Sequence, residues 1–172
     1  MTLPARRQPA WSASFAATAE EHLDDVYGYL VYLTRDRSLA EDLAAETFEK
    51  ALKHWRRFDP ARASARTWLC QIARTTALDW FRSEERRRRR EERAAPPERV
   101  DVTLAEGLSP ELEAARASLS AGEREVIALR VLLELDGDEA ARVLGVSPTA
   151  VSTRLSRALK KLEERMDSHV AV

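Results

Sequence analysis

The chain has few residues that form covalent or metal cross-links, with one cysteine and three histidines among its 172 residues. Cys70 alone excludes an internal disulfide and a cysteine-rich zinc site, and we interpret it as a small buried residue. The histidines His22, His54 and His169 are far apart, and none has a second ligand-type residue at ligand spacing. The sequence therefore predicts neither a metal site nor a cofactor.

Glycine, proline and long apolar runs are also scarce. With 5 Gly and 7 Pro, and with Ala, Leu, Arg and Glu dominating, the composition favours an all-α fold. No apolar run approaches the roughly 20 residues of a membrane span, and no signal-peptide core is present. We therefore expect no membrane insertion and a cytoplasmic protein. The net charge is −1 although 33% of the residues are charged, so the placement of the charges matters more than their sum.

The segment 137–161 has the pattern of a helix-turn-helix. Gly145 is suited to a left-handed helix end, and Ser147-Pro148 is suited to an N-cap and a first helical position. In the second helix, the apolar residues recur at three- and four-residue spacing. The opposite face carries hydroxyl and basic groups, which suit phosphates and base edges in the major groove: Thr149, Ser152, Thr153, Arg154, Ser156, Arg157 and Lys160. The alternative is a solvated amphipathic helix packed on its neighbour.

The N-terminal half begins with a leader, residues 1–12, that lacks periodicity and is expected to be flexible. An apolar stripe from Phe15 to Leu33 predicts a first helix. Ser38 and Glu41 have capping-box spacing, which predicts a second helix over about 39–56. Acids at spacings of four and three follow one side of that helix: Asp42, Glu46 and Glu49. Taken alone, this strip is an ordinary solvated face, although it is also suited to a basic partner surface.

Aromatic and arginine residues are mixed in the next segment. From Arg62 to Arg93 there are ten arginines and five acids, with five arginines in a row at 86–90. This composition is typical of single-strand nucleic-acid sites, where bases stack on rings and phosphates contact cations. We interpret Arg62, Arg66, Arg74 and Arg82 as exposed. For Trp68, core packing and base stacking remain equally open.

Residues 94–117 contain prolines, one glycine and an excess of acids, which predicts an acidic linker. Ser109-Pro110 is a helix start, and Ser120 with Glu123 forms a capping box. The helix after Ser120 should end near Asp136-Gly137, and the last helix near Arg165. We therefore divide the chain into a leader (1–12), a helical domain (13–93), a linker (94–117), a helix-turn-helix domain (118–166) and a frayed tail (167–172).

Three blocks in series resemble the extracytoplasmic-function sigma factors of bacterial RNA polymerase. AEDLAAETFEKA (40–51) is similar to the family's region 2.2. ARTWLCQIARTTALDWFRSEERRRR (65–89) is similar to regions 2.3 and 2.4. Residues 119–162 are similar to region 4. The resemblance implies an all-α protein whose two small helical domains, region 2 and region 4, are joined by a linker.

The same resemblance implies roles for individual residues. Asp42, Glu46 and Glu49 would bind the β′ clamp helices of the polymerase core, and the apolar part of region 4 would meet the β flap. The −10 promoter element would be recognised and melted by one group: Arg66, Trp68, Arg74, Thr75, Asp79, Arg82 and Arg86. The exposed face of the last helix would read the −35 element. The acidic linker would follow the RNA exit path, and an anti-sigma factor is an expected partner.

The sequence departs from the family's pattern at positions that set promoter preference. Thr75 stands where an asparagine is common, and Ala150, Ser152 and Thr153 replace parts of the usual recognition-helix turn. Promoter sequences therefore do not transfer. One alternative function is an autonomous helix-turn-helix regulator that binds duplex DNA without polymerase. A nucleic-acid enzyme is the other, but we find neither a metal-binding carboxylate cluster nor a nucleophile–base pair.

Overall fold

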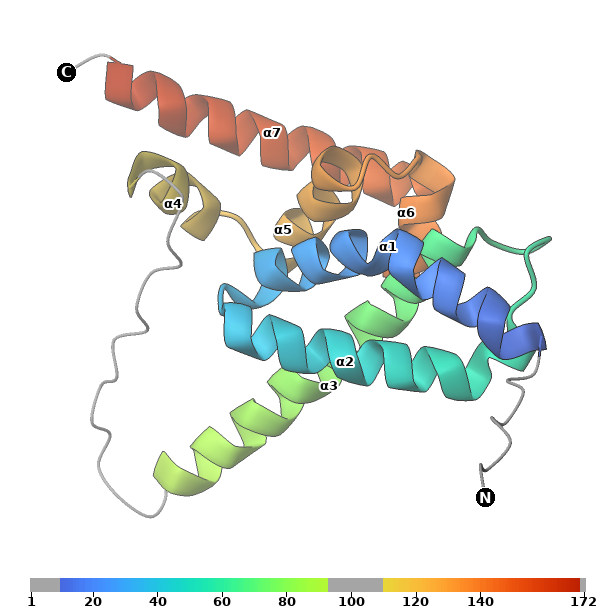
Figure 1. The fold of residues 1–172 in the computed structure, drawn as a ribbon. Coiled ribbons are helices and arrows are strands. Elements are labelled where there is room, and N and C mark those ends of the chain that lie inside the picture. Colours follow the sequence, from blue (N-terminus) through green and yellow to red (C-terminus); the bar gives the residue numbers. More distant parts are fainter. Residues whose placement is uncertain (1–9, 93–109, 171–172) are drawn as a thin grey trace, which may run out of the picture.

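The computed structural model describes residues 10–92 and 110–170, and within these ranges every regular element is helical (Figure 1). The predicted all-α class is therefore confirmed. Among the described residues, no helix is both long and apolar enough to cross a membrane. The leader up to residue 9, residues 93–109 of the predicted linker and the last two residues lie outside the described ranges.

The first unit contains α1 (Ala10–Thr34), α2 (Arg37–His54), the short 3-10 turn η1 (Trp55–Arg57) and α3 (Ala65–Glu92). The three long helices pack against one another, and the C-terminal half of α3 projects beyond the other two (Figure 1). Their shared core contains large side chains with almost no exposure, among them Tyr29, Leu30, Leu43 and Leu69. Because the start of α1 is Ala10, the last three residues of the predicted leader are helical.

The start of α2 differs from the prediction. Asp36 is the N-cap residue, and its carboxylate accepts a hydrogen bond from the backbone N–H of Leu39 at 3.0 Å. Ser38 lies inside the first turn, so the predicted Ser38–Glu41 capping box does not form. Asp and Ser are comparable N-cap residues, and a sequence with both in the same turn offers two starts of similar free energy.

The second unit contains α4 (Pro110–Ala117), α5 (Ala121–Ile127), the π-helical turn η2 (Ala128–Leu132), α6 (Gly137–Leu144) and α7 (Pro148–Val170). The predicted helix start at Pro110 is confirmed, so residues 110–117 of the expected linker are helical. The helix α7 also continues to Val170, beyond the expected end near Arg165. Helices α4, α5 and α6 each pack on α7, which forms the long outer edge of this unit (Figure 1).

Local capping signals define the helix-turn-helix. Gly145 ends α6 with φ 67, and Ser147 accepts a hydrogen bond from the N–H of Ala150 at 3.2 Å before α7. These two predictions are confirmed. The Ser120–Glu123 capping box is also confirmed, and a second box that we did not predict joins Asp136 and Glu139 at the start of α6.

The two units share one hydrophobic core. Buried side chains of α1, α2 and α3 are continuous with Val126, Leu129, Leu133 and Leu135 of the second unit. Helix α6 packs on α3, and η2 packs on α1. The helix-turn-helix is therefore held against the aromatic-arginine helix, and this contact positions the candidate site.

Candidate nucleic-acid interface

The outer face of α7 carries most of its predicted contact residues in exposed positions. Thr149, Ser152, Thr153, Ser156, Arg157 and Lys160 are all exposed. Arg154 is half-buried and turns toward α5, because a Cβ added at Gly122 would lie 3.6 Å from its Nη1. Arg157 is therefore the more accessible of the two arginines on this helix.

The predicted contact residues of α3 lie on two different faces. Thr75, Asp79, Arg82 and Arg86 are exposed, and Arg82 forms an ion pair with Asp79 at 3.3 Å. The Thr75 hydroxyl donates to the carbonyl oxygen of Gln71 at 2.9 Å, within its own helix. Thr75 and Asp79 line a hollow together with Lys50 and His54 of α2, whereas Arg82 and Arg86 lie in the C-terminal half of α3.

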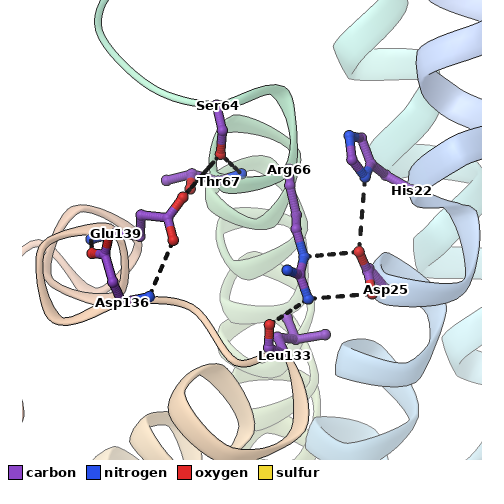
Figure 2. A network of polar contacts seen from close by, with 8 residues as sticks. All are labelled: His22, Asp25, Ser64, Arg66, Thr67, Leu133, Asp136 and Glu139. Carbon is purple, nitrogen blue, oxygen red and sulfur yellow. Dashed lines mark hydrogen bonds and ion pairs between the residues drawn. The ribbon is translucent and has the colours of Figure 1, made fainter.

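Arg66 and Arg74 are only half-buried rather than exposed, which corrects our prediction. Arg66 forms an ion pair with Asp25 of α1 at 2.8 Å and donates to the carbonyl oxygen of Leu133 (Figure 2). The guanidinium of Arg74 donates to both carboxylate oxygens of Glu125 on α5, at 3.0 and 3.2 Å. A sequence pattern cannot separate these arginines from Arg82, because their partners lie in distant segments.

A third contact joins the start of α3 to the start of α6. The hydroxyls of Ser64 and Thr67 donate to Glu139 at 3.1 and 3.0 Å, as Figure 2 shows. The side-chain amide of Gln71, one turn further along α3, donates to the carbonyl oxygen of Arg142 at 3.0 Å. One face of α3 is thus bonded to the second unit over two turns.

Trp68 belongs to an aromatic cluster at the base of α3. Its ring centroid lies 5.9 Å from that of Trp55 and 5.2 Å from that of Phe58. The loop before α3 and this ring enclose a hollow of about 630 Å³ with a strongly basic lining: Arg57, Phe58, Asp59, Arg62, Ala63, Trp68, Gln71 and Arg142. Trp68 therefore packs in an aromatic cluster and also lines the hollow, and base stacking on its ring stays a prediction.

Sequence analysis missed several lining residues of this hollow. Arg57, Phe58 and Gln71 were not singled out. Their place in the sequence could have indicated them, because the loop from Phe58 to Ser64 joins two helical segments that carry aromatic residues. A hollow with ring faces and guanidinium groups suits a nucleobase and its phosphate.

The arginine run is largely paired within α3. Arg87 contacts Glu84 at 2.6 Å, and Arg89 contacts Glu85 at 2.8 Å. The hydrogen bond from Glu84 raises the pKa of Arg87. Exposed ion pairs at this spacing add little to helix stability, so they compete only weakly with a phosphate.

The acidic strip on α2 is exposed as the sequence predicted. Asp42, Glu46 and Glu49 are exposed, and Glu46 and Glu49 form ion pairs with Lys50 and Lys53 at 2.7 and 2.6 Å. The hydrogen bond from Lys53 lowers the pKa of Glu49, so this carboxylate stays charged. An apolar groove of about 350 Å³ lies beside the strip and is lined by Leu23, Asp24, Tyr27, Glu41, Ala44, Ala45 and Phe48.

Two buried groups of the first unit, Tyr29 on α1 and Cys70 on α3, are held neutral. Burial raises the pKa of Tyr29 well above its usual value, and the nearby charge of Glu125 adds to the effect. Burial likewise raises the pKa of the Cys70 thiol to about 12.

Among the described residues, no group of three or more His, Cys, Asp or Glu side chains is placed to hold a metal ion.

Comparison with known proteins identifies both units. Residues 18–87 match the sigma-70 region 2 family, and residues 110–162 match the sigma-70 region 4 family. The extracytoplasmic-function (ECF) RNA polymerase sigma factor SigX of Bacillus subtilis is 30% identical over 164 residues, covering 90% of this chain and 84% of SigX. The ECF sigma factor SigC of Mycobacterium tuberculosis is 36% identical over 137 residues, covering 78% of this chain and 73% of SigC.

Solved structures share the arrangement of helices. The sigma factor RpoE from Bartonella quintana, solved with the anti-sigma factor NepR, gives a TM-score of 0.74 at 24% identity, covering 90% of this chain and 97% of RpoE. CnrH, solved with the cytosolic domain of CnrY, gives 0.68 at 27% identity, covering 91% and 90% of the two chains. Both family models match in order, and SigX, at 30% identity, is matched over 84% of its length. The chain therefore belongs to the ECF family of RNA polymerase sigma factors.

Proposed function

We propose that this chain is a non-catalytic promoter-specificity subunit, which binds the polymerase core in the cytoplasm and directs it to −10 and −35 elements. The observation that carries this function is the combination, in one chain, of an acidic exposed strip, an aromatic-arginine hollow and a helix-turn-helix. An autonomous regulator needs only the last of these. Family membership supports the same conclusion.

The polymerase contact is assigned to α2. Asp42, Glu46 and Glu49 form an exposed anionic strip beside an apolar groove, and this combination suits a basic amphipathic helical surface. Lys50 and Lys53 hold two of these carboxylates at the surface without burying them. We assign the strip to the β′ clamp helices of the core, and the apolar surface of the second unit to the β flap.

Strand separation is assigned to α3 and the loop before it. An unstacked base would enter the hollow beside Trp68 and Phe58, where Arg57 and Arg62 would meet its phosphates. Unstacking costs a few kcal/mol, while each aromatic contact returns about 1–3 kcal/mol. Arg82 and Arg86 extend the cationic surface along the projecting end of α3. The separated strand is thus stabilised without ATP, and only locally.

Duplex recognition is assigned to α7. Its exposed hydroxyls and Arg157 suit the phosphates and base edges of the −35 major groove. The sigma factor RpoE, which shares this arrangement of helices, was solved in complex with the anti-sigma factor NepR. We propose an anti-sigma partner for this chain as well, and the apolar groove between α1 and α2 is a suitable place for it to bind.

The test separates polymerase binding from DNA opening. Asp42→Lys should weaken binding to core polymerase about tenfold or more, because it reverses a charge at an electrostatic contact. Glu20→Lys, an equal charge change on exposed α1, should leave binding unchanged. Arg62→Ala should keep core binding and reduce promoter opening. Equal core affinity in the wild type, Asp42→Lys and Glu20→Lys would overturn the α2 assignment.

A further inference from the structure

The basic hollow at the base of α3 is lined by three arginines that have no acidic partner. Arg57, Arg62 and Arg142 are all exposed residues of its lining. Within residues 10–92 and 110–170, their guanidinium groups make no hydrogen bond or ion pair. Arg82 of α3, by contrast, is paired with Asp79 at 3.3 Å. The cations of the basic hollow are therefore available to a ligand.

The lining of the basic hollow has an excess of positive charge. Its three guanidinium groups face one carboxylate, that of Asp59, which leaves an excess of two. The Asp59 carboxylate already accepts a hydrogen bond from the backbone N–H of Ala61 at 2.9 Å. Unpaired guanidinium groups bind phosphate oxygens through charged hydrogen bonds. The basic hollow is thus suited to a ligand that carries two or more negative charges.

The three arginines come from separate segments of the chain. Arg57 ends η1, Arg62 lies in the loop before α3, and Arg142 lies on α6. Helix α6 is held beside the hollow because Gln71 donates to the carbonyl oxygen of Arg142 at 3.0 Å. The phosphates of a strand follow one another along a line, whereas those of a nucleoside diphosphate or triphosphate are crowded at one end. Cations that converge from three segments favour the more compact anion.

Two aromatic rings supply a surface for a base. Phe58 and Trp68 are half-buried and line the basic hollow. Their centroids are 5.2 Å apart, so the rings are in contact and a base fits against them rather than between them. Trp55, which is not part of the lining, stacks on Phe58 with a centroid distance of 5.0 Å and supports it. Exposed ring faces of this kind stack on nucleobases.

The size of the basic hollow fits a small ligand. Its volume of about 630 Å³ lies within the range of about 300–1,000 Å³ that is usual for small-molecule sites. A neighbouring hollow of about 390 Å³ also borders Trp68, but its lining contains Asp79 and only one lysine, Lys50. That lysine is already paired with Glu46 at 2.7 Å. Free cations and ring faces therefore occur together in the larger hollow.

We propose that the basic hollow binds a free nucleoside diphosphate or triphosphate. The base stacks against Phe58 and Trp68, and the phosphates contact Arg57, Arg62 and Arg142. This adds a small-molecule ligand to a site where the proposed function places only a base of the −10 strand. It shares with that function the premise that the hollow accepts a nucleobase. Because both ligands occupy the same space, each should exclude the other.

The test is isothermal titration calorimetry of the full chain with ATP, at fixed ionic strength and without divalent cations that would shield its phosphates. Adenosine and inorganic tripolyphosphate present the base and the phosphates separately. ATP should bind at least tenfold more tightly than either, because it alone contacts both the rings and the guanidinium groups. Tripolyphosphate binding as tight as that of ATP would show simple charge attraction and overturn the proposal.

Substitutions identify the site. Arg142→Ala and Arg62→Ala should each weaken ATP binding about tenfold, because each removes one contact to phosphate. Both residues are exposed, so the fold should tolerate the changes, and circular dichroism checks this. Arg37→Ala is the matched control, since Arg37 is an exposed arginine of α2 outside the lining. Equal losses in Arg37→Ala and Arg142→Ala would show a general charge effect and overturn the proposal.

Promoter opening by reconstituted holoenzyme separates failure of this proposal from failure of the proposed function. If ATP does not bind but Arg62→Ala still reduces opening, the hollow accepts only a base within a strand, and the nucleotide proposal alone is overturned. If ATP does not bind and Arg62→Ala leaves opening unchanged, the assignment of the hollow to the −10 strand is overturned as well. Single-stranded DNA that fails to displace bound ATP would contradict a shared site.

Discussion

Arg74 on α3 and Glu125 on α5 face each other across the junction of the two units, with two hydrogen bonds of 3.0 and 3.2 Å between them. Side-chain exposure is 25% for the arginine and 11% for the glutamate, so the pair is largely shielded from water. A cation that the sequence offers to DNA is therefore already matched by an anion from the same chain. In this arrangement the Nε and Nη2 atoms of Arg74 both donate to Glu125.

The first prediction concerns the recognition helix. Arg157→Ala should weaken −35-dependent initiation about tenfold, since a good arginine–base or arginine–phosphate contact contributes roughly 1–3 kcal/mol. Arg154→Ala should act in the same direction but less strongly, because its side chain is turned toward Gly122. Run-off transcription with reconstituted holoenzyme measures both effects. Each should vanish on a template whose −35 element has been replaced, while core binding stays unchanged.

The turn between α6 and α7 gives a prediction on stability. Gly145 has φ 67, a left-handed conformation that costs a residue with a Cβ about 1–2 kcal/mol. Gly145→Ala should therefore lower the free energy of unfolding by roughly that amount, although nothing lies within 4 Å of the added Cβ. Chemical denaturation measures the change.

Gly28→Ala is the matched control for the turn. Gly28 lies inside α1, also with open space around it and with no positive φ. Because alanine is the better helix former by about 1 kcal/mol, this variant should be more stable than the wild type. Equal effects of the two substitutions would show that backbone strain at position 145 is not responsible.

A pH dependence follows from Glu123. Its carboxylate accepts from Lys161 at 2.8 Å and from the Ser120 N–H at 2.8 Å, and these hydrogen bonds lower its pKa below 4.5. A lowered folded-state pKa stabilises the fold fully above the unfolded value and loses that contribution as pH falls through the lowered one. Glu123→Gln should therefore cost about 1 kcal/mol at neutral pH and progressively less below pH 4.5.

Thermal or chemical unfolding of both proteins across this pH range measures the difference between them. Glu163→Gln, an exposed position on α7, is the control and should show no such difference. A cost for Glu123→Gln that stays constant from neutral to acid pH would contradict the account of this carboxylate.

The cysteine provides a probe of the first unit. Cys70 is buried with a pKa of about 12, so its thiolate is scarce and shielded at mildly alkaline pH. Alkylation of the native protein should be slow and should become rapid in denaturant. A cysteine placed at the exposed position Ala16 should react at once in the same assay. Equal rates at the two positions would show that the core around Cys70 opens readily.

Much of the fold follows from local signals. Gly145, Ser147-Pro148 and the Ser120–Glu123 box define helix ends through contacts within four residues, so the sequence alone predicts them. Asp36 was missed because Ser38 is an equally good cap nearby. The π-helical turn was missed because its shape depends on how Leu129 and Leu133 pack in the shared core.

The candidate site was only partly predictable, because the exposure of its arginines depends on contacts between segments that are distant in sequence. Exposed Arg82 and half-buried Arg74 look alike in sequence, since both follow apolar residues on one helix. Glu125 is 51 positions away from Arg74 and lies in another unit. Residue type predicts nucleic-acid chemistry for this segment, but which cations are accessible is decided by tertiary contacts.

The central claim is tested most directly by reconstituted transcription. Purified protein and core polymerase, incubated with fragments of the source genome, should give transcripts that core polymerase alone does not give. Sequencing of their 5′ ends should show two shared elements, one near −10 and one near −35. Transcripts that do not depend on the protein, or starts without shared upstream elements, would contradict the account.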